Sequence, residues 1–182
     1  MTSGEFLTRA TIWITILAYT SGVATFAIAG QRRSLLSLTR ILWTAAWLSL
    51  VAHIGFAFHF YHGWSHYEAY QQTARETFEV FGLNWGGGLY INYLLLAGWF
   101  VDLAAWWTAG LCSYVQRPWP VIFGWHGFMI FIIFNATVVF ETGWVRWCGA
   151  MLCAGTALLL VLGLQRNAHR TWRKNFLADS KH

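Results

Sequence analysis

Five long apolar stretches, separated by short charged segments, constrain this chain more than any other feature of its sequence. They run over about 10–30, 41–61, 89–114, 119–140 and 144–164. A helix needs roughly 20 mostly apolar residues to cross the hydrocarbon layer of a membrane, and each stretch is about that long. The strands of a membrane barrel would instead alternate in polarity over about ten residues. The sequence therefore predicts an all-α integral membrane protein, a bundle of about five transmembrane helices.

The composition excludes a water-soluble globular protein. Charged residues make up 10% of the chain and apolar residues 57%, whereas about a quarter of the residues in a soluble domain are charged. The segments left outside the apolar stretches are short: chiefly a loop over 62–88, in which Thr73-Ala74-Arg75-Glu76 matches a helix capping box, and a basic tail over 165–182. We expect a single membrane domain over 1–182 in contact with the lipid bilayer.

The distribution of Lys and Arg predicts the orientation, because these residues are retained on the cytoplasmic side. If the N-terminus lies outside, three basic residues are extracytoplasmic: Arg9, Arg75 and Arg146. The other nine of the 12 are then cytoplasmic: Arg32, Arg33, Arg40, Arg117, Arg166, Arg170, Arg173, Lys174 and Lys181. We therefore expect a multi-pass protein of the inner (cytoplasmic) membrane, with an extracytoplasmic N-terminus and loop and a cytoplasmic C-terminus. No nucleic-acid partner is expected, since a basic patch indicates one only on an accessible soluble face.

Several ionisable side chains lie in or against the predicted spans, where a central charge costs roughly 2.5 to 3.5 kcal/mol on insertion scales. Counting about 1.5 Å of rise per residue separates them into two groups by depth. The outer group consists of His59, His62, His66 and Glu141, and the inner-to-middle group of His53, Asp102 and His126. Both groups are candidate functional sites.

The outer histidines have the spacing of a metal or haem site. At about 100° per residue, His59, His62 and His66 share one face of a helix, provided that the helix continues through Gly63. Such a stripe of imidazoles, with Glu141 at similar depth, suits a transition metal such as iron, copper or zinc, or the iron of haem b. The alternative is that these histidines belong to an interfacial aromatic belt.

Asp102 and His126 lie at similar depth in different predicted spans. We therefore expect them to pair, with the carboxylate of Asp102 orienting the imidazole of His126. Together with His53 they are candidate cofactor-binding residues. The alternative is a hydrogen-bonded pair that only fixes helix packing, with His53 as an interhelical histidine.

These features support three functional hypotheses, and the sequence leaves open whether the protein is an enzyme. The first is a membrane protein that binds a transition metal or one haem through its histidines, as a redox enzyme or the membrane subunit of one. The second is a non-catalytic assembly or scaffold subunit of a larger complex, with other membrane subunits as partners. The third is a small transporter or proton path through His53, Asp102 and His126.

The orientation predicts where a reporter fused after His182 will be active. A cytoplasmic reporter should be active there and a periplasmic one inactive, because the basic residues hold the last segment inside. Paired fusions of the two reporters measure this directly. Periplasmic activity would contradict either the orientation or the odd number of spans.

Overall fold

The computed structural model describes the backbone of residues 2–30 and 32–179, and the side chains of these residues as far as Arg166. Within these residues the protein is all helical, with 86% helix and no strands. Five helices are long and apolar enough to cross a membrane. They are α1 (Ser3–Ala29), α2 (Arg33–Phe60), α4 (Gly88–Ala109), α5 (Trp119–Phe134) with its π-helical extension η2 (Asn135–Val139), and α6 (Gly143–Asp179). The predicted fold class is confirmed at this level.

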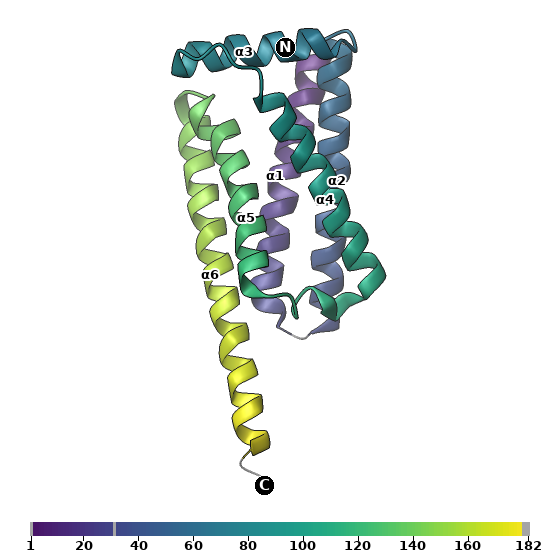
Figure 1. The fold of residues 1–182 in the computed structure, drawn as a ribbon, viewed down its shortest axis with the longest axis vertical. Coiled ribbons are helices and arrows are strands. Elements are labelled where there is room, and N and C mark those ends of the chain that lie inside the picture. Colours follow the sequence, from purple (N-terminus) through teal and green to yellow (C-terminus); the bar gives the residue numbers. More distant parts are fainter. Residues whose placement is uncertain (1, 31, 180–182) are drawn as a thin grey trace.

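The five long helices form a bundle, and α3 (His66–Phe81) lies across one end of it (Figure 1). The N-terminus is at this end, which we call the α3 end. At the opposite end, the short 3₁₀ helix η1 (Leu111–Ser113) lies in the connection between α4 and α5. We call this the η1 end, and α6 extends beyond it (Figure 1). The predicted basic tail is helical as far as Asp179, and residues 180–182 lie outside the described residues.

Local signals account for the helix limits that differ from the sequence prediction. Helix α1 begins at Ser3, earlier than expected, because Thr2 and Glu5 form a capping box at its start. Helix α4 ends at Ala109 because Gly110 adopts a φ of +89°, which other residues rarely adopt.

The loop over 62–88 contains the amphipathic helix α3. Its N-cap is Ser65, whose hydroxyl accepts a hydrogen bond from the amide of Glu68. The capping-box match at Thr73 is therefore not a helix start. The Thr73 hydroxyl instead donates to the carbonyl of Ala69 inside the same helix.

Aromatic side chains fill the core of the bundle. Tyr19 of α1, Trp43 of α2 and Trp99 and Trp106 of α4 are each at most 2% exposed. The Trp43 ring lies 5.1 Å from the Tyr19 ring and 5.6 Å from the Trp99 ring, centroid to centroid. The outward faces carry exposed apolar side chains such as Leu17, Val101 and Met151, which is compatible with contact with lipid.

The contact between α1 and α6 depends on a glycine. A Cβ atom on Gly163 would lie 2.8 Å from the Cα of Ala27, whereas a Cβ on Gly155 of the same helix would meet nothing within 4 Å. We expect Gly163→Ala to lower the free energy of unfolding by about 1–3 kcal/mol through overpacking. The control Gly155→Ala should raise it by up to about 1 kcal/mol, because alanine is the better helix former. Unfolding titrations in detergent measure both changes, and equal effects would contradict this packing.

Candidate functional site

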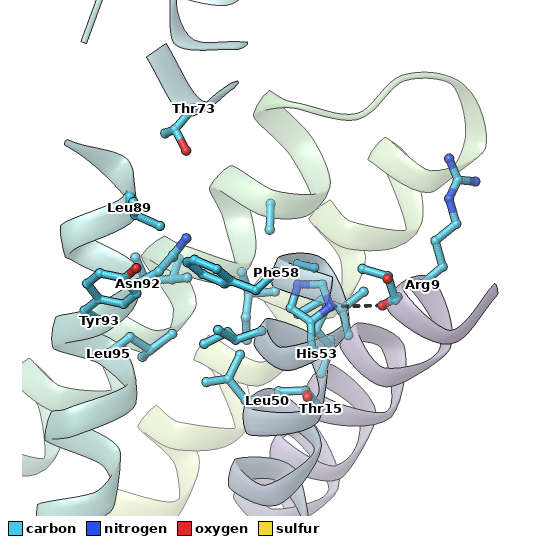
Figure 2. Close-up of a pocket in the computed structure, with 18 of the residues that line it drawn as sticks. Arg9, Thr15, Leu50, His53, Phe58, Thr73, Leu89, Asn92, Tyr93 and Leu95 are labelled. Atoms are coloured by element: carbon cyan, nitrogen blue, oxygen red, sulfur yellow. Dashed lines mark hydrogen bonds between the residues drawn. The ribbon is translucent and has the colours of Figure 1, made fainter. Parts of the chain in front are cut away.

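A cavity of about 660 Å³ lies inside the bundle between α1, α2, α4 and α5, below α3 (Figure 2). Each helix contributes residues spaced three or four apart, so one face of each helix borders the cavity. The walls include Thr8, Ile12, Thr15, Ile16 and Tyr19 of α1; Leu50, His53, Ile54, Ala57 and Phe58 of α2; Leu89, Asn92, Tyr93 and Trp99 of α4; and Met129, Ile132, Ile133 and Ala136 of α5 and η2. Gln72, Thr73 and Glu76 of α3 line the end nearest that helix.

The polarity of the cavity changes along its length. Charged and polar groups such as Arg9, His62, Glu76 and Glu141 line the α3 end, and Arg9 and Glu76 are exposed. The inner end is formed by Ile16, Tyr19, Trp99 and Met129, each at most 2% exposed. The cavity is therefore accessible from the α3 end and closed by packed side chains at its inner end.

His53 places a hydrogen-bond acceptor on the cavity wall. Its Nδ1 lies 2.9 Å from the backbone carbonyl oxygen of Thr8, the bond drawn as a dashed line in Figure 2. Because a carbonyl oxygen only accepts, Nδ1 carries the proton in this bond. In the neutral imidazole, Nε2 then has a free lone pair.

His126 is buried beneath the inner end of the cavity. Its Nδ1 lies 3.1 Å from the hydroxyl oxygen of Tyr19, and its Nε2 lies 3.1 Å from that of Tyr114. The imidazole is 1% exposed. It therefore links a cavity-wall residue to a residue of the η1 end through two hydrogen bonds.

Asp102 pairs with Arg117 and not with His126, so the predicted Asp102–His126 pair is wrong. The carboxylate of Asp102 forms an ion pair with the Arg117 guanidinium and accepts a hydrogen bond from the indole nitrogen of Trp43 at 3.0 Å. Arg117 reaches Asp102 because the chain turns back after α4. A charged guanidinium binds a carboxylate more strongly than a neutral imidazole does.

Tyr114 contacts both Arg117, which forms the ion pair with Asp102, and the imidazole of His126. The Arg117 Cζ atom lies 4.4 Å from the centroid of the Tyr114 ring, and the Tyr114 hydroxyl oxygen lies 3.1 Å from Nε2 of His126. Burial raises the pKa of the Tyr114 phenol well above its ordinary value. The phenol is thus a neutral hydroxyl at physiological pH.

The predicted stripe of outer histidines on one helix is also wrong. Helix α2 ends at Phe60, and Gly63 and Trp64 both adopt positive φ angles, 52° and 62°, which turn the chain into α3. His59 remains on α2, His62 lies in the turn, and His66 begins α3. A turn between them therefore replaces the continuous helix that the stripe requires.

The outer residues have three different surroundings. His62 and Glu141 line the cavity, together with His53. His59 is exposed and packs near the Phe60 and Trp64 rings, and the Nδ1 of His66 lies 3.1 Å from the hydroxyl of Tyr93. In the described part of the chain, no three His, Cys, Asp or Glu residues form a group suited to a metal ion. Metal or haem binding at these positions stays a prediction.

Sequence reasoning missed the residues of the inner end, above all Tyr19 and Trp99. Aromatic residues in an apolar span are indistinguishable from core by composition. A weak signal was present in α1, where Thr8, Thr15 and Tyr19 recur at helical spacing and mark one face as more polar than a lipid-facing surface requires.

Comparison with known proteins does not assign the site. No protein-family model, curated protein or solved structure matches this chain. The geometry of the cavity and of the residues around it is therefore the basis for a functional proposal.

The ion pair of Asp102 and Arg117 should couple α4 energetically to the connection that follows it. The two side chains are 9% and 21% exposed, so we expect Asp102→Asn and Arg117→Gln each to lower the free energy of unfolding by about 1–3 kcal/mol. A double-mutant cycle should give a coupling of about 0.5–3 kcal/mol. Arg75→Gln on the exposed face of α3 is the control and should be additive with Asp102→Asn. Additivity of Asp102→Asn with Arg117→Gln would contradict the pairing.

Proposed function

We propose that this protein is a membrane-embedded binding protein for an amphipathic small molecule, which it holds in the cavity between α1, α2, α4 and α5. The observation that carries the proposal is the polarity gradient of that cavity. Its exposed α3 end has charged and polar groups, and its buried inner end is formed mainly by apolar side chains. A molecule with a polar end and an apolar body matches this gradient.

The size of the cavity supports a small molecule as the occupant. Ligand pockets usually have volumes of about 300–1,000 Å³, and this cavity has about 660 Å³. The walls come from four helices and are therefore rigid on the side that receives the apolar body. A preformed site of this kind binds without a large ordering cost.

The polar end of the cavity has both hydrogen-bond donors and hydrogen-bond acceptors that can orient the molecule. His53 Nε2 accepts hydrogen bonds, Asn92 has an amide that both donates and accepts, and Glu76 and Glu141 are acceptors when ionised. A hydroxyl or ammonium group on the ligand would find partners among them. These groups favour one orientation of the ligand, with its polar end toward α3.

The predicted orientation of the chain sets the side from which the ligand enters. Arg33, Arg40 and Arg117 lie toward the η1 end, which we propose to be cytoplasmic because Lys and Arg are retained on that side. The cavity then opens toward the extracytoplasmic side of the inner membrane. We propose entry from that side, beneath α3.

A cavity-filling variant tests the proposal. Tritiated dodecanol, which has a hydroxyl and a long apolar chain, should bind saturably to the protein in lipid nanodiscs in a scintillation proximity assay. Ala57→Phe places a bulky ring on the cavity wall and should weaken binding at least tenfold. Its matched control is Ala97→Phe, an exposed position of α4 that does not line the cavity.

The control separates cavity binding from nonspecific partition into lipid. Ala97→Phe should bind as the wild type does, and both variants should retain thermal stability in detergent. Equal binding by Ala57→Phe and the wild type, or no saturable binding by the wild type, would refute the proposal.

A further inference from the structure

Arg40 of α2 is a cation that no carboxylate balances within the described part of the chain. The ion pair found there joins Arg117 to Asp102. The other described carboxylates lie at the α3 end, whereas Arg40 lies toward the η1 end; they are Glu5, Glu68, Glu76, Glu79 and Glu141. A charge in or near the hydrocarbon layer is costly without a partner, so Arg40 favours an anion from outside these residues.

The position of Arg40 along α2 matches the level of lipid headgroups. After Arg40, the helix continues from Ile41 to Phe60, which is about 20 residues or roughly 30 Å at 1.5 Å per residue. This length equals the thickness of the hydrocarbon layer, and α2 is apolar enough to cross it. With these residues in the hydrocarbon, Arg40 lies at its boundary, next to the phosphate groups of phospholipids.

A tryptophan of α4 holds the guanidinium of Arg40 in place. The Arg40 Cζ atom lies 3.7 Å from the centroid of the Trp107 ring, the arrangement of a cation–π contact. The Trp107 ring is itself oriented by a hydrogen bond of 3.2 Å from its indole nitrogen to the Thr44 hydroxyl. The guanidinium is therefore ordered before any anion binds, which lowers the entropy cost of binding.

The outer part of the guanidinium is accessible. In the described part of the chain, the buried side-chain atoms without a hydrogen-bond partner are Arg40 Nε, Trp99 Nε1 and Trp125 Nε1. The two terminal nitrogens of Arg40, Nη1 and Nη2, have no partner among the described residues either, and they are not among these buried atoms. They therefore reach the protein surface, where a guanidinium can donate two parallel hydrogen bonds to one phosphate group.

Apolar side chains continue the surface from Arg40 toward the α3 end. At about 100° per residue, Leu48 and Val51 lie within about 80° of Arg40 around α2, and they are 55% and 38% exposed. Beside them on α4, Phe100 is 55% exposed, and its ring lies 5.5 Å from that of Trp47 of α2, centroid to centroid. A cation at one end of an exposed apolar strip fits a molecule with an anionic head and an acyl chain.

We propose that Arg40 and Trp107 form a binding site for the phosphate of an anionic phospholipid, whose acyl chains lie along the exposed apolar side chains of α2 and α4. Inorganic phosphate would use the guanidinium alone, so the apolar strip favours a lipid as the occupant. Arg33 adds positive charge, because it lies two helical turns before Arg40 on the same face of α2, about 10 Å away. The site lies toward the opposite end of the bundle from the mouth of the cavity and is independent of the function proposed for that cavity.

Lipid titrations followed by native mass spectrometry test the site. The full-length protein in detergent is titrated with dioleoyl phosphatidylglycerol, which is anionic, or with dioleoyl phosphatidylcholine, whose own ammonium group balances its phosphate. The wild type should bind the first molecule of phosphatidylglycerol at least about tenfold more tightly than phosphatidylcholine. Arg40→Gln should reduce this preference to less than about threefold, because it removes the charged donors.

Two further variants separate a specific site from diffuse electrostatic attraction. Arg32→Gln removes an equal charge from the exposed residue before α2 and should keep the preference within about twofold of the wild type. Trp107→Leu leaves the net charge unchanged and should weaken phosphatidylglycerol binding about threefold, since the guanidinium loses the ring that orders it. Circular dichroism checks that each variant remains helical.

Three results would overturn the site: no preference for phosphatidylglycerol in the wild type, an equal loss of preference in Arg32→Gln and Arg40→Gln, or unchanged phosphatidylglycerol binding by Trp107→Leu. Inorganic phosphate at matched ionic strength should leave lipid binding unchanged, and competition by it would overturn the assignment to a lipid. None of these results bears on dodecanol binding in the cavity, so the two proposals fail or stand separately.

Discussion

The constraint on which this structure depends is that a polar group on a helix apolar enough to cross a membrane must find its partner within the protein. Water is absent from the hydrocarbon layer, and an unpaired polar group there costs several kcal/mol. Threonine hydroxyls find their partners within their own helix. Thr11, Thr15 and Thr39 each donate to a backbone carbonyl one turn earlier. Larger polar groups need partners from other elements, and these longer connections position the candidate site.

The longer connections join the helices in a definite order. His53 of α2 bonds to the backbone of α1, Trp43 of α2 bonds to Asp102 of α4, and Asp102 pairs with Arg117 in the connection to α5. His126 of α5 then bonds to Tyr19 of α1 and to Tyr114. Each of these bonds pairs a polar group whose burial without a partner would cost free energy. Together they hold four helices around the cavity and leave a space that packing alone does not fill.

Near the inner end of the cavity, the hydrogen bonds that satisfy His126 leave one tyrosine hydroxyl proton without a partner in the imidazole. The imidazole of His126 has one donor and one acceptor for two tyrosine hydroxyls, so a hydroxyl proton must remain. The fold places one of these tyrosines on the cavity wall and the other in packed core. Which tyrosine keeps that proton therefore depends on where the two tyrosines lie, and not on the hydrogen bonds of His126 alone.

The sequence by itself determined the fold class and the approximate spans, because the length of an apolar helix is set by the thickness of the hydrocarbon layer. It also singled out His53, His62 and Glu141, which line the cavity, since ionisable residues in apolar stretches are conspicuous. Only the tertiary structure decided which groups meet. Arg117 has the sequence character of a cytoplasmic topology charge, yet it pairs with Asp102 because the chain turns back after α4.

The predicted histidine stripe and the inner end of the cavity also show that a sequence pattern does not predict which segments meet. Helical periodicity places His59, His62 and His66 on one face, but two positive φ angles after Phe60 end the helix before that geometry can form. In the sequence Tyr19 and Trp99 are indistinguishable from ordinary core residues, and only the packing of four helices places them at the inner end of a cavity. Hydrophobic length is a local property that a sequence displays directly. Side-chain pairs and cavities involve several segments of the chain at once, so they form only when those segments pack together.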